Sequence, residues 1–215
     1  MFFLSGLDYP LWSNKRIISE LEKNPEKEYI CGMSVTTCDK PSKIKKKVTL
    51  YHFFRDIAIR NGKIKRILSG SSRIITSLLP IRKKPYIKDG ARKLEVFQGS
   101  SWWCLTWDCM TYIASQFNNE KINKYFKTSF APDEMRIQTI VFNSRYAQNA
   151  ILYRGEYPGL VGLTPLHTIH YDGAIKIYTE KDYDDLKDKD RMFFRKAVSD
   201  ISDKLLDMID FDRKC

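Results

Sequence analysis

A chain of 215 residues, of which 43% are hydrophobic and 29% charged, can bury one substantial core, as a single domain or one with a small appendage. No apolar run approaches the ~20 residues that cross a bilayer, and the opening MFFLSGL lacks the basic leader of a signal peptide, so a cytoplasmic protein is predicted. The five cysteines are odd in number and form no CxxC pair, which argues against a disulfide framework or a zinc knuckle.

The net charge of +11 is concentrated in one segment. Residues 43–93 hold 16 Lys and Arg against two acids, a local net charge of +14, which leaves −3 for the remainder of the chain. The basicity therefore belongs to this segment, and the whole chain is not expected to be a nucleic-acid binder.

Hydrophobic periodicity and turn residues predict alternating strands and helices. Up to residue 93, they predict an initial buried strand followed by a turn at Asp8-Tyr9-Pro10, a helix over 13–24, a strand over 26–35, and a mostly helical basic insertion over 43–93 with a polar turn region at 82–93. After the insertion, they predict a strand–turn–strand unit over 94–105, helices over 106–117 and 133–144, strands over 166–172 and 174–179, and a helical, acid-rich tail over 182–211. Ile17, Ile18 and Leu21 should share one face of the first helix. The mixture favours a single α/β domain over 1–215, with 43–93 as an insertion.

A metal site is not predicted. His167 and His170 are three residues apart, which places them on opposite faces of a strand, where they cannot chelate one ion. His52 stands alone, and the sequence contains neither a Gly-rich phosphate loop nor a G-x-S-x-G turn.

Two segments carry aromatic and cationic residues at informative positions. In GSSWWCL, Trp102 and Trp103 should point to opposite faces of a strand, so that one enters the core and the other faces an apolar partner or a ligand, unless both simply pack. In RMFFRKA, Arg195 and Lys196 follow an apolar pair. They are either solvated surface charges or a clamp for a diphosphate, since Arg offers a fork and Lys a point charge.

The segment FAPDEMRIQTI raises a similar choice. Pro132 suits a first helical position, and Asp133 is best interpreted as an acid that complements the helix dipole. Glu134 either does the same or is held there to accept a proton.

Four segments together resemble the core-2/I-branching family of β-1,6-N-acetylglucosaminyltransferases, which also includes the protein xylosyltransferases. FFLSGLDYPLWSNKRI is similar to the family's Ser/Cys-Gly-x-Asp-Tyr/Phe-Pro segment, and GSSWWCLTWDCMTYI to its Gly-Ser-x-Trp-Trp/Phe unit. FAPDEMRIQTIVFNS resembles its Ser/Ala-Pro-Asp-Glu motif, and MFFRKAVSDIS its closing Phe-Ala-Arg-Lys-Phe-Asp element. The segments follow the family's order, and residues 43–93 are the least matched part.

The resemblance implies a GT-A-like α/β fold and an inverting glycosyltransferase that moves a sugar, N-acetylglucosamine first among the candidates, from a UDP-sugar to a glycan hydroxyl. Glu134 would be the general base that deprotonates this hydroxyl. No metal or other cofactor is expected, because family members typically work without a metal-binding Asp-x-Asp and neutralise the departing diphosphate with basic side chains.

The resemblance also assigns the remaining site residues. Arg195 and Lys196 match the family's Arg-Lys as diphosphate ligands, and Ser101 and Trp102 match donor-side positions, while Trp103 is core or an acceptor platform.

Two further positions are less specific. His167 stands on the donor side where many relatives carry an Arg, and a histidine is a weaker, pH-dependent phosphate ligand. Asp8 either supports the active-site loop by hydrogen bonds or caps the turn or the next helix.

Alternatives to an active enzyme remain open. The family's nucleotide-binding βα segment is expected upstream of the Ser-Gly-x-Asp-Tyr-Pro strand and is missing from this sequence, so the chain is a fragment, is completed by a partner, or is a catalytically inactive remnant. The insertion 43–93 suggests that the chain binds peripherally to the inner face of an anionic membrane, near a lipid-linked saccharide acceptor. The alternative is that the insertion is a solvated, charged helix pair. A nucleic-acid-binding module in the same segment is a third function, which leaves the four motifs unexplained.

Overall fold

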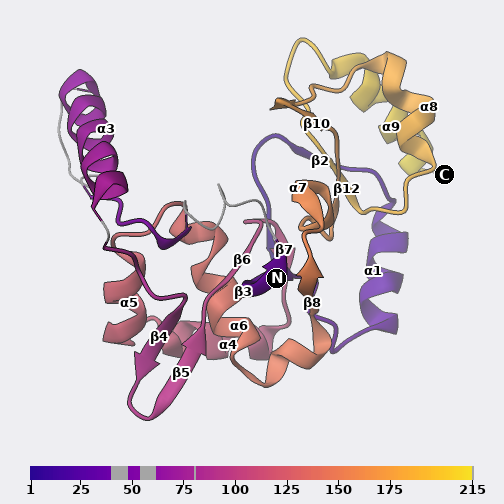
Figure 1. Ribbon diagram of the computed structural model, residues 1–215. Helices are drawn as coiled ribbons and strands as arrows, with labels where there is room; N and C mark the ends of the chain where they lie inside the picture. The colour runs from indigo at the N-terminus through magenta and orange to yellow at the C-terminus, as the bar shows by residue number, and fades with distance from the viewer. Residues whose placement is uncertain (40–47, 54–61, 80, 215) are drawn as a thin grey trace.

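The computed structural model describes residues 1–39, 48–53, 62–79 and 81–214. The predicted mixture of helices and strands is confirmed (Figure 1). The helical elements are α1 (Asn14–Lys23), α3 (Gly62–Leu78), α4 (Trp107–Gln116), α5 (Glu120–Phe126), α6 (Arg136–Phe142), α7 (Gly159–Gly162), α8 (Tyr183–Lys187) and α9 (Asp203–Lys214), with the 3-10 turns η1 (Pro132–Glu134), η2 (Arg145–Asn149) and η3 (Glu180–Asp182). The strands are β1 (Phe2–Phe3), β2 (Asp8–Pro10), β3 (Cys31–Asp39), β4 (Tyr86–Asp89), β5 (Arg92–Glu95), β6 (Phe97–Gly99), β7 (Trp103–Cys104), β8 (Ile151–Glu156), β9 (His167–Ile169), β10 (Tyr171–Asp172), β11 (Ala174–Ile175) and β12 (Phe193–Arg195).

Two three-stranded sheets organise the chain. In the first, β3 lies between antiparallel β6 and parallel β8. In the second, β12 lies between antiparallel β2 and parallel β9, so it joins the beginning of the chain to its last quarter. The pairs β1–β7, β4–β5 and β10–β11 are two-stranded and antiparallel.

The larger core packs α4, α5 and α6 against the first sheet. Its buried members include Ile30, Phe97, Ile113 and Ile140. A Cβ at Gly99 would lie 2.1 Å from the Cys31 carbonyl oxygen, so the close approach of β6 to β3 requires glycine there. This contact fixes where β6 ends and the following Ser100–Trp102 turn begins.

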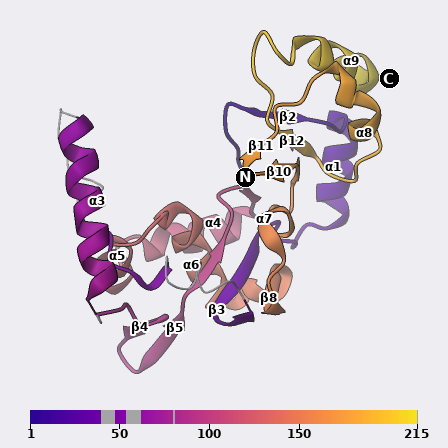
Figure 2. The ribbon, with the colours of Figure 1, turned by 45° about the horizontal axis from the view of Figure 1, so that its top comes forward.

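A second core forms around β2 and β12, with α8 and α9 packed over them. Its buried residues include Tyr178, Leu186, Phe194 and Leu205. Figures 1 and 2 show this region beside α1 and apart from α3, which extends away from the rest of the molecule.

The first predicted helix forms with Ser13 as its N-cap, whose hydroxyl accepts the Arg16 amide at 3.3 Å. Ile17 and Leu21 pack inward as predicted, but Ile18 is 53% exposed. Residues 17 and 21 are one turn apart, whereas residue 18 is rotated by about 100° from residue 17 and so faces solvent.

Two predictions for the second sheet were wrong. The predicted turn Asp8-Tyr9-Pro10 is the strand β2, and the turn lies at Gly6 and Leu7. Pro10 is tolerated because β2 is an edge strand. Residues 193–195, predicted within a helical tail, form the central strand β12, which pairs with β2 and β9 and buries Phe193 and Phe194 in two separate clusters.

The basic insertion is only partly helical. Gly62–Leu78 forms α3 as predicted, but Tyr51–Phe53 is not helical, and the polar region 82–93 contains the β4–β5 hairpin, which turns at Gly90 and Ala91. Gly90 has a φ of 59°, which favours glycine at this turn. The predictions for residues 43–47 and 54–61 lie outside the described residues.

Candidate functional site

A buried carboxylate, Asp8, lies on the edge strand β2 of the second sheet, directly across from Arg195 of the central strand β12. Its side chain is fully buried and accepts the Ser5 amide at 2.6 Å and the Arg195 Nη1 at 2.7 Å. Arg195 also donates to the Ser5 hydroxyl, and its own side chain is 15% exposed. The guanidinium is therefore held inside the fold by two partners from the first turn of the chain.

His167 of β9 completes this cluster. Its Nε2 lies 3.4 Å from Asp8 Oδ2, within ion-pair range, yet among the described residues neither ring nitrogen has a hydrogen-bond partner. Burial alone would raise the pKa of Asp8, but the proximity of His167, the Ser5 amide and Arg195 together bring that pKa below its ordinary value. The lowered pKa means that the surroundings of Asp8 favour its anionic form.

Trp102, the last residue of the Ser100–Trp102 turn, packs against Arg195 and His167. The Arg195 guanidinium carbon lies 4.7 Å from the Trp102 ring centre, and the Trp102 and His167 rings are 5.5 Å apart. Trp103, the next residue, is 5% exposed and stacks on Phe3 at 5.1 Å. The two tryptophans thus separate as the strand pattern predicts, Trp103 into the core and Trp102 toward the ion pair.

The same turn is tied to the segment that carries Glu134. The Ser101 hydroxyl donates to Asp133 Oδ2 at 2.9 Å, and the Gln138 amide donates to the Ser100 carbonyl at 2.6 Å. The turn η1 begins after Ala131, which has a φ of 44°, unusual for a residue other than glycine. Side-chain contacts therefore join Asp8 to Arg195, Arg195 to Trp102, and Ser101 to Asp133 of η1, and the backbone of the turn joins Trp102 to Ser101.

Glu134 itself is half-buried and lies near the carboxyl edge of the first sheet. Burial raises the pKa of Tyr157, and the charges of Cys38 and Glu134 raise it further. Tyr157 follows β8, and Cys38 lies near the end of parallel β3. The carboxyl ends of parallel strands are where open α/β sheets bind ligands.

Lys196 directly follows β12 and is half-buried. Its backbone amide donates to the Lys176 carbonyl, and its own carbonyl accepts the Tyr178 amide. The predicted pair Arg195–Lys196 is therefore divided: Arg195 binds Asp8, whereas Lys196 is anchored through its backbone.

Sequence reasoning missed three participants in this cluster. Ser5 and Gln138 lie within two of the family-like segments but were given no role there, and Tyr157 lies outside all four. Ser5 was detectable as the first residue of the Ser-Gly-x-Asp motif and through its spacing, since its amide binds a carboxylate three residues later, as in a turn.

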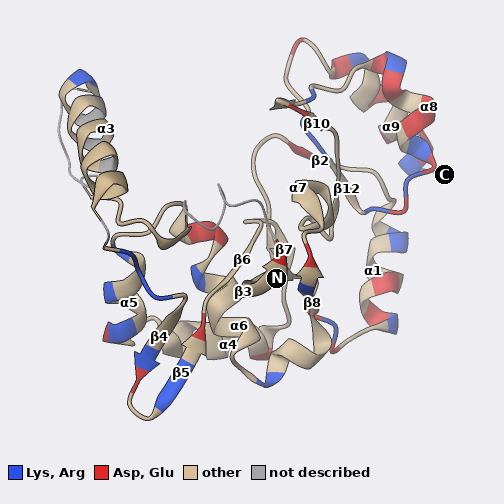
Figure 3. Ribbon diagram, viewed as in Figure 1, with Lys and Arg blue, Asp and Glu red and all other residues tan. Residues whose placement is uncertain are grey.

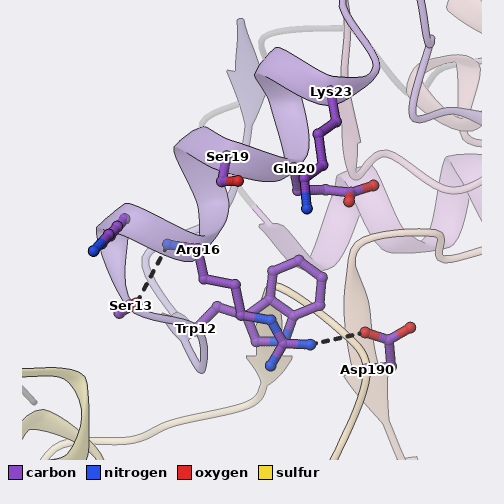
Figure 4. Close-up of a pocket in the computed structure, with 8 residues that line it drawn as sticks. Trp12, Ser13, Arg16, Ser19, Glu20, Lys23 and Asp190 are labelled. Carbon is purple, nitrogen blue, oxygen red and sulfur yellow. Dashed lines mark hydrogen bonds and ion pairs between the residues drawn. The ribbon is translucent and has the colours of Figure 1, made fainter.

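A separate pocket of about 470 Å³ opens beside the N-terminal half of α1 (Figure 4). Arg16 stacks on Trp12 at 3.9 Å and pairs with Asp190 at 3.1 Å, and the Trp12 indole donates to the Lys189 carbonyl at 3.3 Å. These contacts bind α1 to the loop before β12. None of the residues predicted as site residues lines this pocket.

In residues 1–39, 48–53, 62–79 and 81–214, no group of three or more His, Cys, Asp and Glu side chains is placed to hold a metal ion. Within the same ranges, no helix has both the length and the apolar character needed to cross a membrane. Cys31, Cys38, Cys104 and Cys109 are buried and reduced, as predicted.

The family model of the core-2/I-branching enzymes matches residues 1–156. This match includes Asp8, Ser101, Trp102 and Glu134, whereas β9 and β12 lie beyond it. No curated protein has a significantly similar sequence. Because the match covers well over half of the sequence and contains three of the four motifs, the chain belongs to the core-2/I-branching enzyme family, a family of glycosyltransferases.

Proposed function

We propose that the chain is an inverting, metal-independent glycosyltransferase with a GT-A-like fold, which moves a sugar, N-acetylglucosamine as the first candidate, from a UDP-sugar to a glycan hydroxyl. The observation that carries this proposal is the continuous set of contacts from Asp8 through Arg195, Trp102 and Ser101 to η1. These residues and η1 come from all four of the family-like motifs, which are far apart in the sequence.

In the proposed reaction, Glu134 takes the proton of the acceptor hydroxyl. The resulting oxygen attacks the anomeric carbon as the bond from that carbon to the UDP oxygen breaks, so that the configuration inverts and UDP leaves with the bonding electrons. The half-buried position of Glu134 beside the carboxyl edge of β3 and β8 supports this role.

The donor side is assigned to Ser101, Trp102, His167, Arg195 and Lys196. Because Arg195 is neutralised by Asp8, the cation that would offset the departing diphosphate is principally Lys196, with Arg195 held as a fixed donor beside it. The unused hydrogen-bonding capacity of the buried His167 ring fits a ligand-facing role. To Asp8 we assign the first of the two roles considered from the sequence, support of the active-site loop by hydrogen bonds, because it accepts the Ser5 amide and the Arg195 guanidinium.

The direct test is release of UDP. The purified chain is incubated with UDP-N-acetylglucosamine and other UDP-sugars, with and without glycan acceptors, and UDP is quantified. Acceptor-dependent release supports the proposal. UDP binding without any turnover would favour the inactive remnant instead, and no binding and no turnover would contradict the donor assignment.

The helix α3 suggests that the enzyme binds at the surface of an anionic membrane. Its outward stripe carries Ile67, Ile74 and Leu78, which are 66%, 61% and 80% exposed. The opposite face buries Ser72 and Thr76, whose hydroxyls donate to the Phe53 and Tyr51 carbonyls. A helix with its polar face inward and its apolar face in solvent, within a segment of net charge +14, suits the interface of an anionic bilayer.

We therefore expect the chain to sediment with vesicles that contain phosphatidylglycerol but not with phosphatidylcholine alone. Replacing Ile67 and Leu78 by Glu should abolish this binding, because the apolar stripe would then have to bury two charges in the bilayer. Ile201→Glu, at a 48% exposed site outside α3, is the control and should sediment like the parent chain. Equal binding by all variants would exclude α3 as the contact.

A further inference from the structure

A pocket of about 530 Å³ lies between α5 and the segment that leads into β4. Six lysines line it, and none of its described lining residues is an acid: Lys83, Lys84, Lys88, Lys121, Lys124 and Lys127. Its volume is within the range of ~300–1,000 Å³ typical of small-molecule sites. Figure 3 shows the basic residues gathered on α5, on β4 and on the segment before it. The pocket shares no residue with the cluster around Asp8 and Glu134.

The lysines of α5 lie on the solvent face of the helix because its opposite face packs into the core. Ile122 and Phe126 are buried in the larger core, which leaves Lys121 and Lys124 in solvent, one helical turn apart. The Asn119 side chain fixes the start of this helix by accepting the Lys121 and Ile122 amides at 3.0 and 3.2 Å. The pocket is therefore built on a capped helix anchored in the core.

Lys83 is the most buried of the six lysines in the lining and is only 4% exposed. Its ammonium donates to the Tyr125 carbonyl at 2.7 Å and to the Ser129 hydroxyl at 2.8 Å, and it lies 4.7 Å from the centre of the Tyr125 ring. Burial lowers the pKa of Lys83 to about 7, and a nearby anion would favour its charged form. A lysine buried in this way is costly, and the described lining offers it no carboxylate.

The lining thus combines concentrated positive charge with aromatic surface. Mutual repulsion among the lysines is unfavourable until a multiply charged anion offsets it. Tyr51 and Tyr125 supply apolar ring surface beside that charge, with the Lys83 ammonium 5.5 Å from the centre of the Tyr51 ring. We propose that this pocket binds an organic phosphate, whose phosphoryl or pyrophosphoryl group lies among the lysines and whose carbon skeleton packs against Tyr51 and Tyr125.

The shape of the site favours a compact ligand over a nucleic acid. A single strand of RNA is bound along an extended basic groove in which successive bases stack on aromatic residues. Here the cations gather around a single pocket, and one of them, Lys83, is buried.

The first experiment titrates the full chain with inorganic pyrophosphate by calorimetry, with sodium sulfate as the comparison and the ionic strength held constant. The proposal expects saturable binding of pyrophosphate, tighter than that of sulfate. The double variant Lys88→Glu/Lys124→Glu should weaken it by about tenfold or more, because two attractive charges become repulsive. Both lysines are exposed, and thermal denaturation checks that the variant is folded.

Lys204→Glu on α9 is the matched control, because it reverses an exposed lysine outside the pocket. Its affinity for pyrophosphate should stay within about twofold of the parent value, since distant surface charges are screened by salt. Equal loss in the control and the double variant, or no preference for pyrophosphate over sulfate, would overturn the proposal.

Two further arms identify the source of the phosphate. Glucose 1-phosphate represents a soluble ester, and vesicles of phosphatidylcholine with phosphatidic acid represent a lipid headgroup. Binding of either one that the double variant loses supports the proposal and names the source. Binding of a 20-nucleotide single-stranded RNA through the same lysines, together with failure of pyrophosphate, glucose 1-phosphate and phosphatidic acid, would replace the proposal with nucleic-acid recognition.

Discussion

Glu134→Gln is expected to reduce the rate of sugar transfer by about 10²–10⁴, the usual contribution of a general base. The amide has nearly the shape of the carboxylate but cannot take the acceptor proton. The main-chain bonds that hold η1, from the Glu134 amide to the Ala131 carbonyl at 3.1 Å and from the Met135 amide to the Pro132 carbonyl at 3.2 Å, do not involve the carboxylate. Affinity for UDP, measured by calorimetry, should therefore be retained.

Glu120→Gln provides the matched control, since Glu120 is also an acid in a first helical turn but is exposed on α5. Its effect on the rate should be within about twofold, as for ordinary surface substitutions. A Glu134→Gln rate within about tenfold of the parent would show that Glu134 is not the base.

Asp8→Asn is the second substitution with a large expected effect, here on stability. Asp8 is fully buried, and Arg195 is largely buried against it. Removing one partner of a buried ion pair leaves an uncompensated charge and costs about 3–5 kcal/mol. The free energy of unfolding, measured with urea, should fall by this amount, and Arg195→Met in the same chain should recover part of the loss. If the double variant were as unstable as the sum of the two single variants, the pair would not be coupled.

The effect of Asp8 should also depend on pH. The pKa of Asp8 in the folded protein is below the ordinary 3.8, so the unfolded chain takes up this proton first as the pH falls. The stabilisation is complete above the unfolded value and is lost as the pH drops toward the folded one. The difference in unfolding free energy between the parent and Asp8→Asn should therefore be constant near neutral pH and become smaller below about pH 4.

Local elements were predictable because their signals lie close together in the sequence. Ser13 precedes an amphipathic helix, and Gly99 with Ser100 interrupts two apolar runs, so α1 and the β6–β7 turn follow from neighbouring residues. The separation of Trp102 from Trp103 was expected from strand alternation, although Trp102 itself precedes β7.

The second sheet was not predictable in the same way. Strand β12 has three residues, too few to show any periodicity. It forms a strand because it pairs with β2 on one side and β9 on the other. Asp8 and Arg195 are far apart in the sequence, so the sequence suggested a turn acid and a phosphate ligand rather than an ion pair. The final role of each is decided by the tertiary contact.

The order of the strands in this sheet has a consequence for synthesis on the ribosome. Strand β2 leaves the ribosome well before β12, because Arg195, which pairs with Asp8 across the two strands, follows it by 187 residues. At about 5–20 residues per second, the buried carboxylate waits roughly 10–40 s for its arginine. A nascent chain released before β12 would contain Glu134, Ser101 and Trp102 but lack the strand that connects them to Asp8. Completion of the candidate site thus depends on a strand that is synthesised long after the residues it joins.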